Sequence, residues 1–214
     1  NNDGWGNAEL QYYTNRPVNA SLDGNGNLAI TAKKEVYAGS AFTSARIKTA
    51  GLFTQAYGRF EANIKTPWGP GIWPAFWLVG SDVDTVGWPQ CGEIDIMELR
   101  GQKPNVISGT VHGPGYSAAS GISKSFALEN NRFDVDFHLF AIEWGKDYID
   151  FFVDNTLYQR ITPGNVNGKW VFDHPFYIIM NVAVGGNYLG FPTNQTPFPQ
   201  TMFVDYVKVY KEAE

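Results

Sequence analysis

The chain has 214 residues, with 16 Lys and Arg against 21 Asp and Glu and a formal net charge of −5. This length suits one domain with a sizeable core. The acidic balance and the lack of a Lys/Arg run argue against a nucleic-acid partner. No apolar run approaches the roughly 18–20 residues of a membrane span, and the polar first residues are unlike a signal sequence, so we expect no membrane partner.

Aromatic residues make up 15% of the chain and charged residues only 17%. Aromatic side chains suit sugar binding, because their flat apolar faces pack on pyranose C–H groups while their polar edges stay hydrated. A large aromatic core would give the same composition. Composition alone therefore leaves these two interpretations balanced.

Short alternating or apolar runs, separated by Gly, Pro, Asn and Asp, follow one another along the chain. This spacing is typical of a β-sandwich. Strands are expected at residues 28–33, 59–65, 73–77, 93–98, 107–112, 137–144, 148–153, 156–161, 176–182 and 202–210, with Asp154-Asn155 as a hairpin turn. We find no repeat, charged tail or linker. The pattern predicts one all-β domain over residues 1–214, built from two antiparallel sheets, with a groove on the curved face of one sheet.

In the segment 73–77 (WPAFW), Trp73, Ala75 and Trp77 share one face of the predicted strand. Two indoles with a small residue between them would form a shelf for a flat ligand, although core packing explains a single Trp equally well. Pro74 disfavours a central position in a sheet, because proline cannot donate to a ladder hydrogen bond.

The most informative segment is 93–98 (EIDIME). In a strand, Glu93 and Asp95 point to one face, and Glu98 falls on the other. A β-bulge near Ile96 or Met97 would return Glu98 to the first face. Three carboxyl groups would then converge.

Carboxylates that lie a few ångströms apart cannot all ionise easily, so at least one pKa should rise towards neutrality. A retaining glycosidase needs one ionised and one protonated carboxyl group roughly 5–5.5 Å apart. The alternatives are a strand whose acids are merely solvated and a metal-binding patch.

Four other residues have two interpretations each. Trp88 lies five residues before Glu93 and would stack on a substrate or pack in the core. Arg46 is a surface cation or a donor to sugar hydroxyls, and His112 binds substrate or simply ends a strand. Cys91, the only cysteine, forms no intrachain disulfide and is a small buried space-filler rather than a nucleophile.

The segments GEIDIME (92–98), GRFEA (58–62) and WPAFW (73–77) closely resemble glycoside hydrolase family 16, and within it the laminarinase branch of endo-β-1,3-glucanases. Matching pieces also occur at residues 6–10, 136–138, 181–186 and 204–207, so the resemblance spans almost the whole chain. The inserted Met of the acidic motif is typical of laminarinases, agarases and carrageenases.

The resemblance implies a concanavalin-like jelly roll with a concave cleft, and it assigns roles residue by residue. Glu93 matches the nucleophile, Glu98 the acid/base and Asp95 the assisting carboxyl between them. The cleft aromatics are matched by Trp73, Trp77 and Trp88, and the polar groups lining the sugar subsites by Asn7, Arg46 and His112.

The resemblance implies no cofactor for catalysis. In many relatives a structural calcium ion is held by an Asp that matches Asp205, together with an amino-terminal segment that does not precede the Gly6–Leu10 motif here. Asp205 is therefore the one candidate metal ligand.

The leading hypothesis is a secreted, monomeric, retaining endo-hydrolase of β-1,3-glucan. Within the enzymes, the alternatives are a mixed-linkage β-1,3-1,4-glucanase, a galactan hydrolase or a transglycosylase. An alternative from another class is a lectin that uses the same aromatic groove without chemistry.

Overall fold

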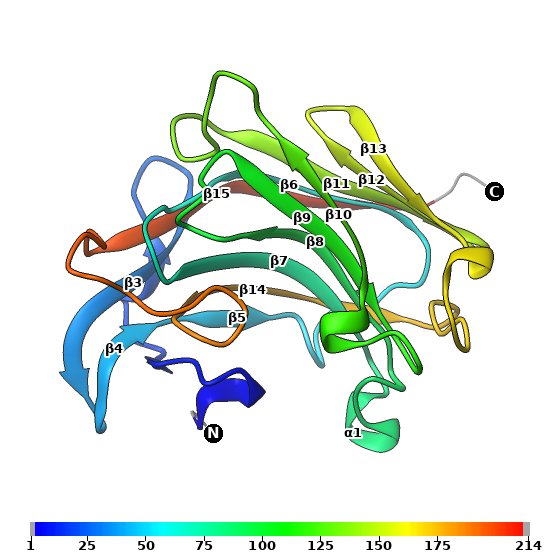
Figure 1. Ribbon diagram of the computed structural model, residues 1–214, viewed down its shortest axis with the longest axis horizontal. Coiled ribbons are helices and arrows are strands. Elements are labelled where there is room, and N and C mark those ends of the chain that lie inside the picture. The colour runs from blue at the N-terminus through cyan, green and yellow to red at the C-terminus, as the bar shows by residue number, and fades with distance from the viewer. Residues whose placement is uncertain (1–2, 212–214) are drawn as a thin grey trace.

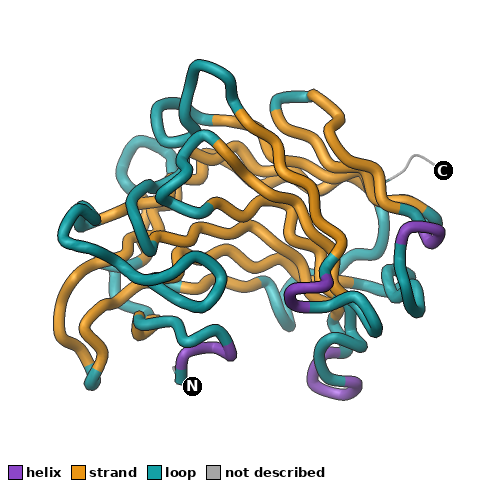
Figure 2. The backbone as a smooth tube through the Cα atoms, viewed as in Figure 1, coloured by secondary structure: helices purple, strands orange, loops and turns teal. Residues whose placement is uncertain are grey.

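The computed structural model describes residues 3–211 and consists of two stacked β-sheets joined by loops (Figures 1 and 2). The larger sheet has the strand order β1-β4-β3-β15-β6-β11-β12-β13, with β2 paired to β3. Its strands are β1 (Gln11–Tyr13), β2 (Ala20–Leu22), β3 (Leu28–Tyr37), β4 (Ser40–Ser44), β6 (Gly58–Lys65), β11 (His138–Gly145), β12 (Tyr148–Val153), β13 (Thr156–Ile161) and β15 (Gln200–Tyr210).

The second sheet has the order β10-β9-β8-β7-β14-β5. Its strands are β5 (Arg46–Lys48), β7 (Ile72–Gly80), β8 (Glu93–Leu99), β9 (Val106–His112), β10 (Ile122–Ala127) and β14 (Phe176–Val184). The described helices are all short: α1 (Val83–Val86) and three 3-10 turns at Gly4–Gly6, Ala118–Ser120 and Pro163–Asn165. None of the helices in residues 3–211 is long and apolar enough to cross a membrane.

One apolar cluster fills the space between the sheets. Each inner face contributes alternate residues, as the period of a strand requires. From β8 the cluster receives Ile94, Ile96, Met97 and Leu99, all at most 1% exposed. Trp144 of β11 lies 5.1 Å from the Phe176 ring of β14 and joins the two layers. The opposite face of the six-stranded sheet is therefore free to carry polar groups, and we refer to it as the site face.

The predicted two-sheet β-sandwich is confirmed, and each predicted strand overlaps an observed one, although β3 and β7 extend four and three residues beyond their predicted ends. The Asp154-Asn155 hairpin is also present, with φ of 47° and 66° at its two turn residues.

Two details differ from the sequence prediction. Strand β7 is central, between β8 and β14, although it contains Pro74. Its pairing with β8 reaches only to Ala75, so Pro74 stands beyond the last paired residue on that side. The sheets are also not wholly antiparallel, because β1 pairs with β4 in parallel.

Gly109 of β9 sets the distance between the two sheets beneath the site face. A Cβ atom at this position would lie 2.3 Å from the Tyr158 hydroxyl and 2.6 Å from Cδ1 of Phe151, both from the other sheet. Only a residue without a side chain lets β9 approach so closely. Gly109 thereby sets how far its neighbour Thr110, on the site face, lies from the larger sheet.

We expect Gly109→Ala to destabilise the fold by about 1–3 kcal/mol, because the added methyl group overpacks the space between the sheets. Gly164→Ala is the matched control, since its Cβ would meet only Thr162 Oγ1 at 3.7 Å. Urea unfolding of both variants measures the difference. Equal stabilities for the two variants would contradict this account of β9.

Candidate active site

A β-bulge in β8 brings three carboxyl groups onto the site face. Trp77 of β7 pairs with Asp95, and Ala75 of β7 pairs with Glu98. Two residues along β7 therefore match three residues along β8, so β8 holds one extra residue. The pairing of β8 with β9 shifts at the same place. The extra residue lies at Ile96 and Met97, both buried in the core. The predicted bulge is thus confirmed, and Glu93, Asp95 and Glu98 share one face.

The carboxyl groups lie in cross-strand rows of site-face residues. The row through Glu98 runs Arg46, Asn181, Ala75, Glu98, Ser108, Ser125 from β5 to β10. The row through Asp95 contains Trp77, Thr110 and Ser123, and the row through Glu93 contains Val79 and His112. A ligand lying across the strands would therefore meet these rows from several strands at once.

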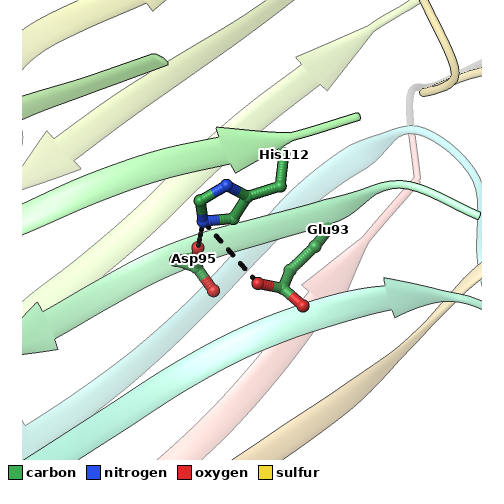
Figure 3. A group of neighbouring side chains, drawn as sticks. All are labelled: Glu93, Asp95 and His112. Carbon is green, nitrogen blue, oxygen red and sulfur yellow. Dashed lines mark ion pairs between the residues drawn. The ribbon is translucent and has the colours of Figure 1, made fainter. Parts of the chain in front are cut away.

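His112 faces two of the carboxyl groups (Figure 3). Its Nε2 atom lies 3.2 Å from Asp95 Oδ2 and 3.7 Å from Glu93 Oε1. At these distances a protonated His112 would pair electrostatically with both carboxylates. The predicted substrate contact of His112 is therefore accompanied by a direct contact with the acidic cluster. Its other ring nitrogen, Nδ1, is buried and has no protein hydrogen-bond partner.

Glu98 receives hydrogen bonds from two neighbouring strands. Trp73 Nε1 of β7 donates to Oε1 over 3.1 Å. Thr110 Oγ1 of β9 lies 3.5 Å from Oε2 and 2.9 Å from the Ser123 hydroxyl of β10. These contacts fix the orientation of a carboxyl group that is 9% exposed.

Burial raises the pKa of each of the three carboxyl groups, because the charged form loses its hydration. The pKa of Asp95 rises to about 8 for this reason. The pKa of Glu98 also rises to about 8, through burial and the neighbouring Asp95, with His112, Trp73 and Thr110 opposing the rise. Burial and the charge of Asp95 raise the pKa of Glu93 well above its usual range. His112 and Arg46 oppose this rise without reversing it.

The predicted Trp residues all lie at the site face or its rim. Trp73 contacts Glu98, and Trp77 Nε1 donates to Asn181 Oδ1 over 2.8 Å. Trp88 is 45% exposed, in the loop after α1, with its ring centre 6.1 Å from that of His112. The three indoles therefore surround the carboxyl groups on two sides.

Arg46 and Asn7 mark the end of the site nearest β5. The Arg46 guanidinium carbon lies 4.5 Å from the ring centre of Trp5 and 4.6 Å from that of Trp77. Asn7 Nδ2 donates to Glu9 Oε1 over 3.3 Å, and Gln11 Nε2 donates to Glu9 Oε2 over 2.7 Å. Asn7 is thus held by a hydrogen-bond network around Glu9, and the charge of Arg46 interacts with Glu9 electrostatically.

Several residues at the site were not identified from the sequence, namely Trp5, Glu9, Thr110, Asn181 and Tyr188. Glu9 lies in the motif 6–10, which was noted for its resemblance but not for its carboxylate. Asn181 lies on the same face as Trp77 by strand pairing, a relation that needs the register of β7 and β14. Trp5 lies in the short 3-10 turn Gly4–Gly6 and Tyr188 in a loop, where no periodic pattern assigns a face.

The predicted calcium ligand does not form a recognisable cation site. Asp205 is exposed at a bulge in β15, and its Oδ2 accepts a 3.0 Å hydrogen bond from Asn63 Nδ2. Within residues 3–211, the only group of three His, Cys, Asp or Glu side chains with the spacing of metal ligands is Glu93, Asp95 and His112. The assignment of Asp205 as a calcium ligand therefore stays a prediction.

Cys91 is fully buried beside Val79 and Ile179. Burial and the nearby Asp82 and Glu93 raise the pKa of its thiol to about 11. These properties agree with a space-filling role rather than a nucleophilic one.

Comparisons with known proteins agree with this geometry. A family model described as glycosyl hydrolases family 16 matches residues 7–208. A β-glucanase of Rhodothermus marinus is 42% identical over 99% of this chain and 77% of its own length. The glucan endo-1,3-β-glucosidase A1 of Niallia circulans is 40% identical, and this chain covers 34% of its length.

Among solved structures, the laminarinase catalytic domain of Thermotoga maritima superposes with a TM-score of 0.94. It is 46% identical, over 99% of this chain and 86% of that chain. Both the fold and the acidic motif are thus shared with proteins described as laminarinases. The chain belongs to family 16 of the glycosyl hydrolases, and its relatives place it in the laminarinase branch.

Proposed function

We propose that this chain hydrolyses β-1,3-glucosidic linkages within laminarin-type β-glucans, with retention of the anomeric configuration. The observation that carries the proposal is the convergence of Glu93, Asp95 and Glu98 on one face of a bulged strand. Its membership of family 16 and the activities named for its relatives support the same conclusion.

In the first step, Glu93 attacks the anomeric carbon while Glu98 protonates the departing glycosidic oxygen. The bond from the anomeric carbon to that oxygen breaks, and a covalent glycosyl-enzyme forms on Glu93. In the second step, the deprotonated Glu98 takes a proton from water, which attacks the same carbon and releases Glu93. No cofactor enters either step.

The surroundings of the two glutamates suit these different roles. Glu93 is the more exposed, and although burial and Asp95 raise its pKa, His112 and Arg46 oppose that rise and favour its ionised form. Glu98 is more deeply buried, and the negative charge of Asp95 favours its protonated form. Asp95 Oδ2 lies 3.2 Å from His112 Nε2, and its negative charge raises the pKa of both glutamates, so it tunes both roles.

The aromatic side chains supply the surface for the sugar rings. Trp73, Trp77 and Trp88 present apolar faces of the size of a pyranose ring, and Asn7 and Arg46 offer polar groups at the β5 end. The alternative substrates are mixed-linkage β-1,3-1,4-glucan and galactans. A non-catalytic lectin would retain the aromatic residues but would have no need of three clustered carboxyl groups, two of them buried, whose desolvation is unfavourable.

The polymeric substrate indicates where the enzyme works. A glucan of this kind lies outside the cell, so we infer that the protein is extracellular and acts as a monomer on single chains of the polymer. Size-exclusion chromatography of the purified chain tests the second point, since elution as a dimer would exclude it.

We expect Glu93→Ala to lose nearly all turnover and still bind laminari-oligosaccharides, because the aromatic surface is untouched. The wild-type protein should release short oligosaccharides from laminarin faster than from barley glucan, agarose or carboxymethyl cellulose. Reducing-end assays and product sizing measure the rates, and NMR of the fresh product should show the β-anomer. Substantial hydrolysis by the variant would exclude Glu93 as nucleophile, and cleavage of agarose alone would change the substrate assignment.

We expect kcat/KM to fall as the pH rises through the pKa of Glu98, about 8, because the acid must be protonated in the free enzyme. Asp95→Asn removes the carboxylate that raises the Glu98 pKa. The alkaline limb of the profile should therefore move to lower pH, and kcat should drop. Initial rates from pH 4 to pH 10 test this, and an alkaline limb that stays in place in the variant would exclude the coupling.

We also expect Glu98→Gln to increase stability relative to wild type as the pH rises. The folded pKa of Glu98 lies above its ordinary value of 4.5, so stability from the protonated group is complete below about pH 4.5 and is lost as the pH rises to about 8. Gln stays neutral, so the Tm difference should grow over this window by several degrees and then level off. Glu129→Gln, the same change at an exposed site, should show no such trend.

A further inference from the structure

A stack of side chains stands at the end of β8, next to Glu98. The Arg100 guanidinium carbon lies 4.1 Å from the Tyr188 ring centre. The Tyr188 ring lies 4.8 Å from the Trp73 ring, with the planes inclined by 33°. Trp73 in turn donates its indole N–H to Glu98 over 3.1 Å. The stack therefore runs from an exposed guanidinium to a buried carboxyl group.

We propose that Tyr188 is a positioning residue for the hydrolysis, which holds the Trp73 indole in the orientation that donates a hydrogen bond to Glu98. This inference rests on the acid/base role proposed for Glu98. The sheet holds the Trp73 backbone on one side only, through pairing with Ala183 of β14, because the pairing of β7 with β8 ends at Ala75. The Trp73 side chain is only partly buried, so the sheet alone does not fix the indole. The ring-to-ring contact with Tyr188 supplies the additional packing that holds the indole.

The loop that carries Tyr188 is itself held in place. Asn187 N donates to the Asn7 carbonyl over 2.7 Å, and Gln102 Nε2 donates to the Leu189 carbonyl over 2.8 Å. These bonds lie on the two sides of Tyr188 in the sequence and tie the loop to the N-terminal segment and to the segment after β8. Tyr188 is therefore fixed before substrate binds, as a positioning residue must be.

The tight fit of the loop backbone adds a further restraint. A Cβ atom at Gly186, where φ is 122°, would lie 3.0 Å from the Asn7 carbonyl oxygen and 3.7 Å from Trp73 Cζ3. The loop backbone itself thus touches both the N-terminal segment and the indole. The same loop aligns Asn7 and Trp73 relative to each other.

The hydrogen bond from Trp73 changes the chemistry of Glu98. An N–H donor stabilises the ionised carboxylate and so lowers the pKa that burial has raised. In the second step this bond helps Glu98 to act as a base. The other ionisable groups that influence Glu98 or are influenced by it are Glu93 and Asp95 of β8, His112 of β9, Tyr158 of β13 and Tyr188 itself.

The experiment compares the pH dependence of kcat/KM on laminari-oligosaccharides for wild type, Tyr188→Ala and Tyr188→Phe. Tyr188→Ala frees the indole, so the alkaline limb should move to higher pH by about one unit, the effect of one hydrogen bond to a charged group. Its kcat should fall several-fold. Tyr188→Phe keeps the ring and loses only the hydroxyl, which interacts with Arg100 and Ser108, and should keep the wild-type limb.

A double-mutant cycle shows whether Tyr188 acts through Trp73. Trp73→Phe removes the N–H donor and should shift the alkaline limb on its own. Adding Tyr188→Ala to this variant should shift the limb no further. Phe191→Ala, which truncates a 53% exposed ring in the same loop, controls for general loosening and should leave the limb in place. If Tyr188→Ala does not fold, Tyr188→Leu fills the space without an aromatic face and should give the same shift.

Independent shifts that add in the double variant, or an unchanged limb in Tyr188→Ala, would overturn the positioning role and leave the proposed function intact. A wild-type protein that binds laminarin without cleaving it would overturn both.

Discussion

The structure of the site depends on one electrostatic constraint, which is that three carboxyl groups lie together on a single strand, with Asp95 and Glu98 buried and Glu93 partly buried. An isolated ionised carboxylate in this position would be strongly unfavourable, so the cluster must hold protons or find donors. The surrounding strands supply them. His112 of β9 faces Asp95 and Glu93, and Trp73 of β7 donates to Glu98. Because Glu93 and Glu98 have different neighbouring groups, two side chains of the same type can take different roles in the reaction.

The bulge in β8 satisfies this constraint without disturbing the core. Two consecutive apolar residues, Ile96 and Met97, point inwards, so the strand loses no buried surface when Glu98 turns outwards. This could be predicted from the sequence, because three acids and two adjacent apolar residues fit a strand only if the alternation breaks once. The central place of β7 could not be predicted, since it depends on where the pairing with β8 stops relative to Pro74.

The site residues that could be predicted follow a local strand pattern, whereas those that could not depend on contacts between distant segments. Side chains on strands of clear alternation, such as Trp73 and Trp77, could be assigned to one face before the fold was known. Tyr188 lies in a Gly-containing loop and Trp5 in the 3-10 turn Gly4–Gly6, and backbone bonds join these two segments, such as the bond from Asn187 to Asn7. No local pattern encodes these bonds. The resemblance to family 16 supplied roles for Asn7, Arg46 and His112 that the residues alone left open.

Catalysis and recognition are thus carried by parts of the molecule with different restraints. The carboxyl groups stand on strands whose other face is core, so a change there affects both folding and chemistry. The aromatic and polar groups that we propose as the polymer contacts stand partly on loops, which tolerate substitution more readily than paired strands do. The preference for one glucan linkage over another can therefore change through residues such as Trp88, 45% exposed in its loop, while the acidic array stays the same. Such a separation is a physical reason why one fold can serve substrates with different linkages.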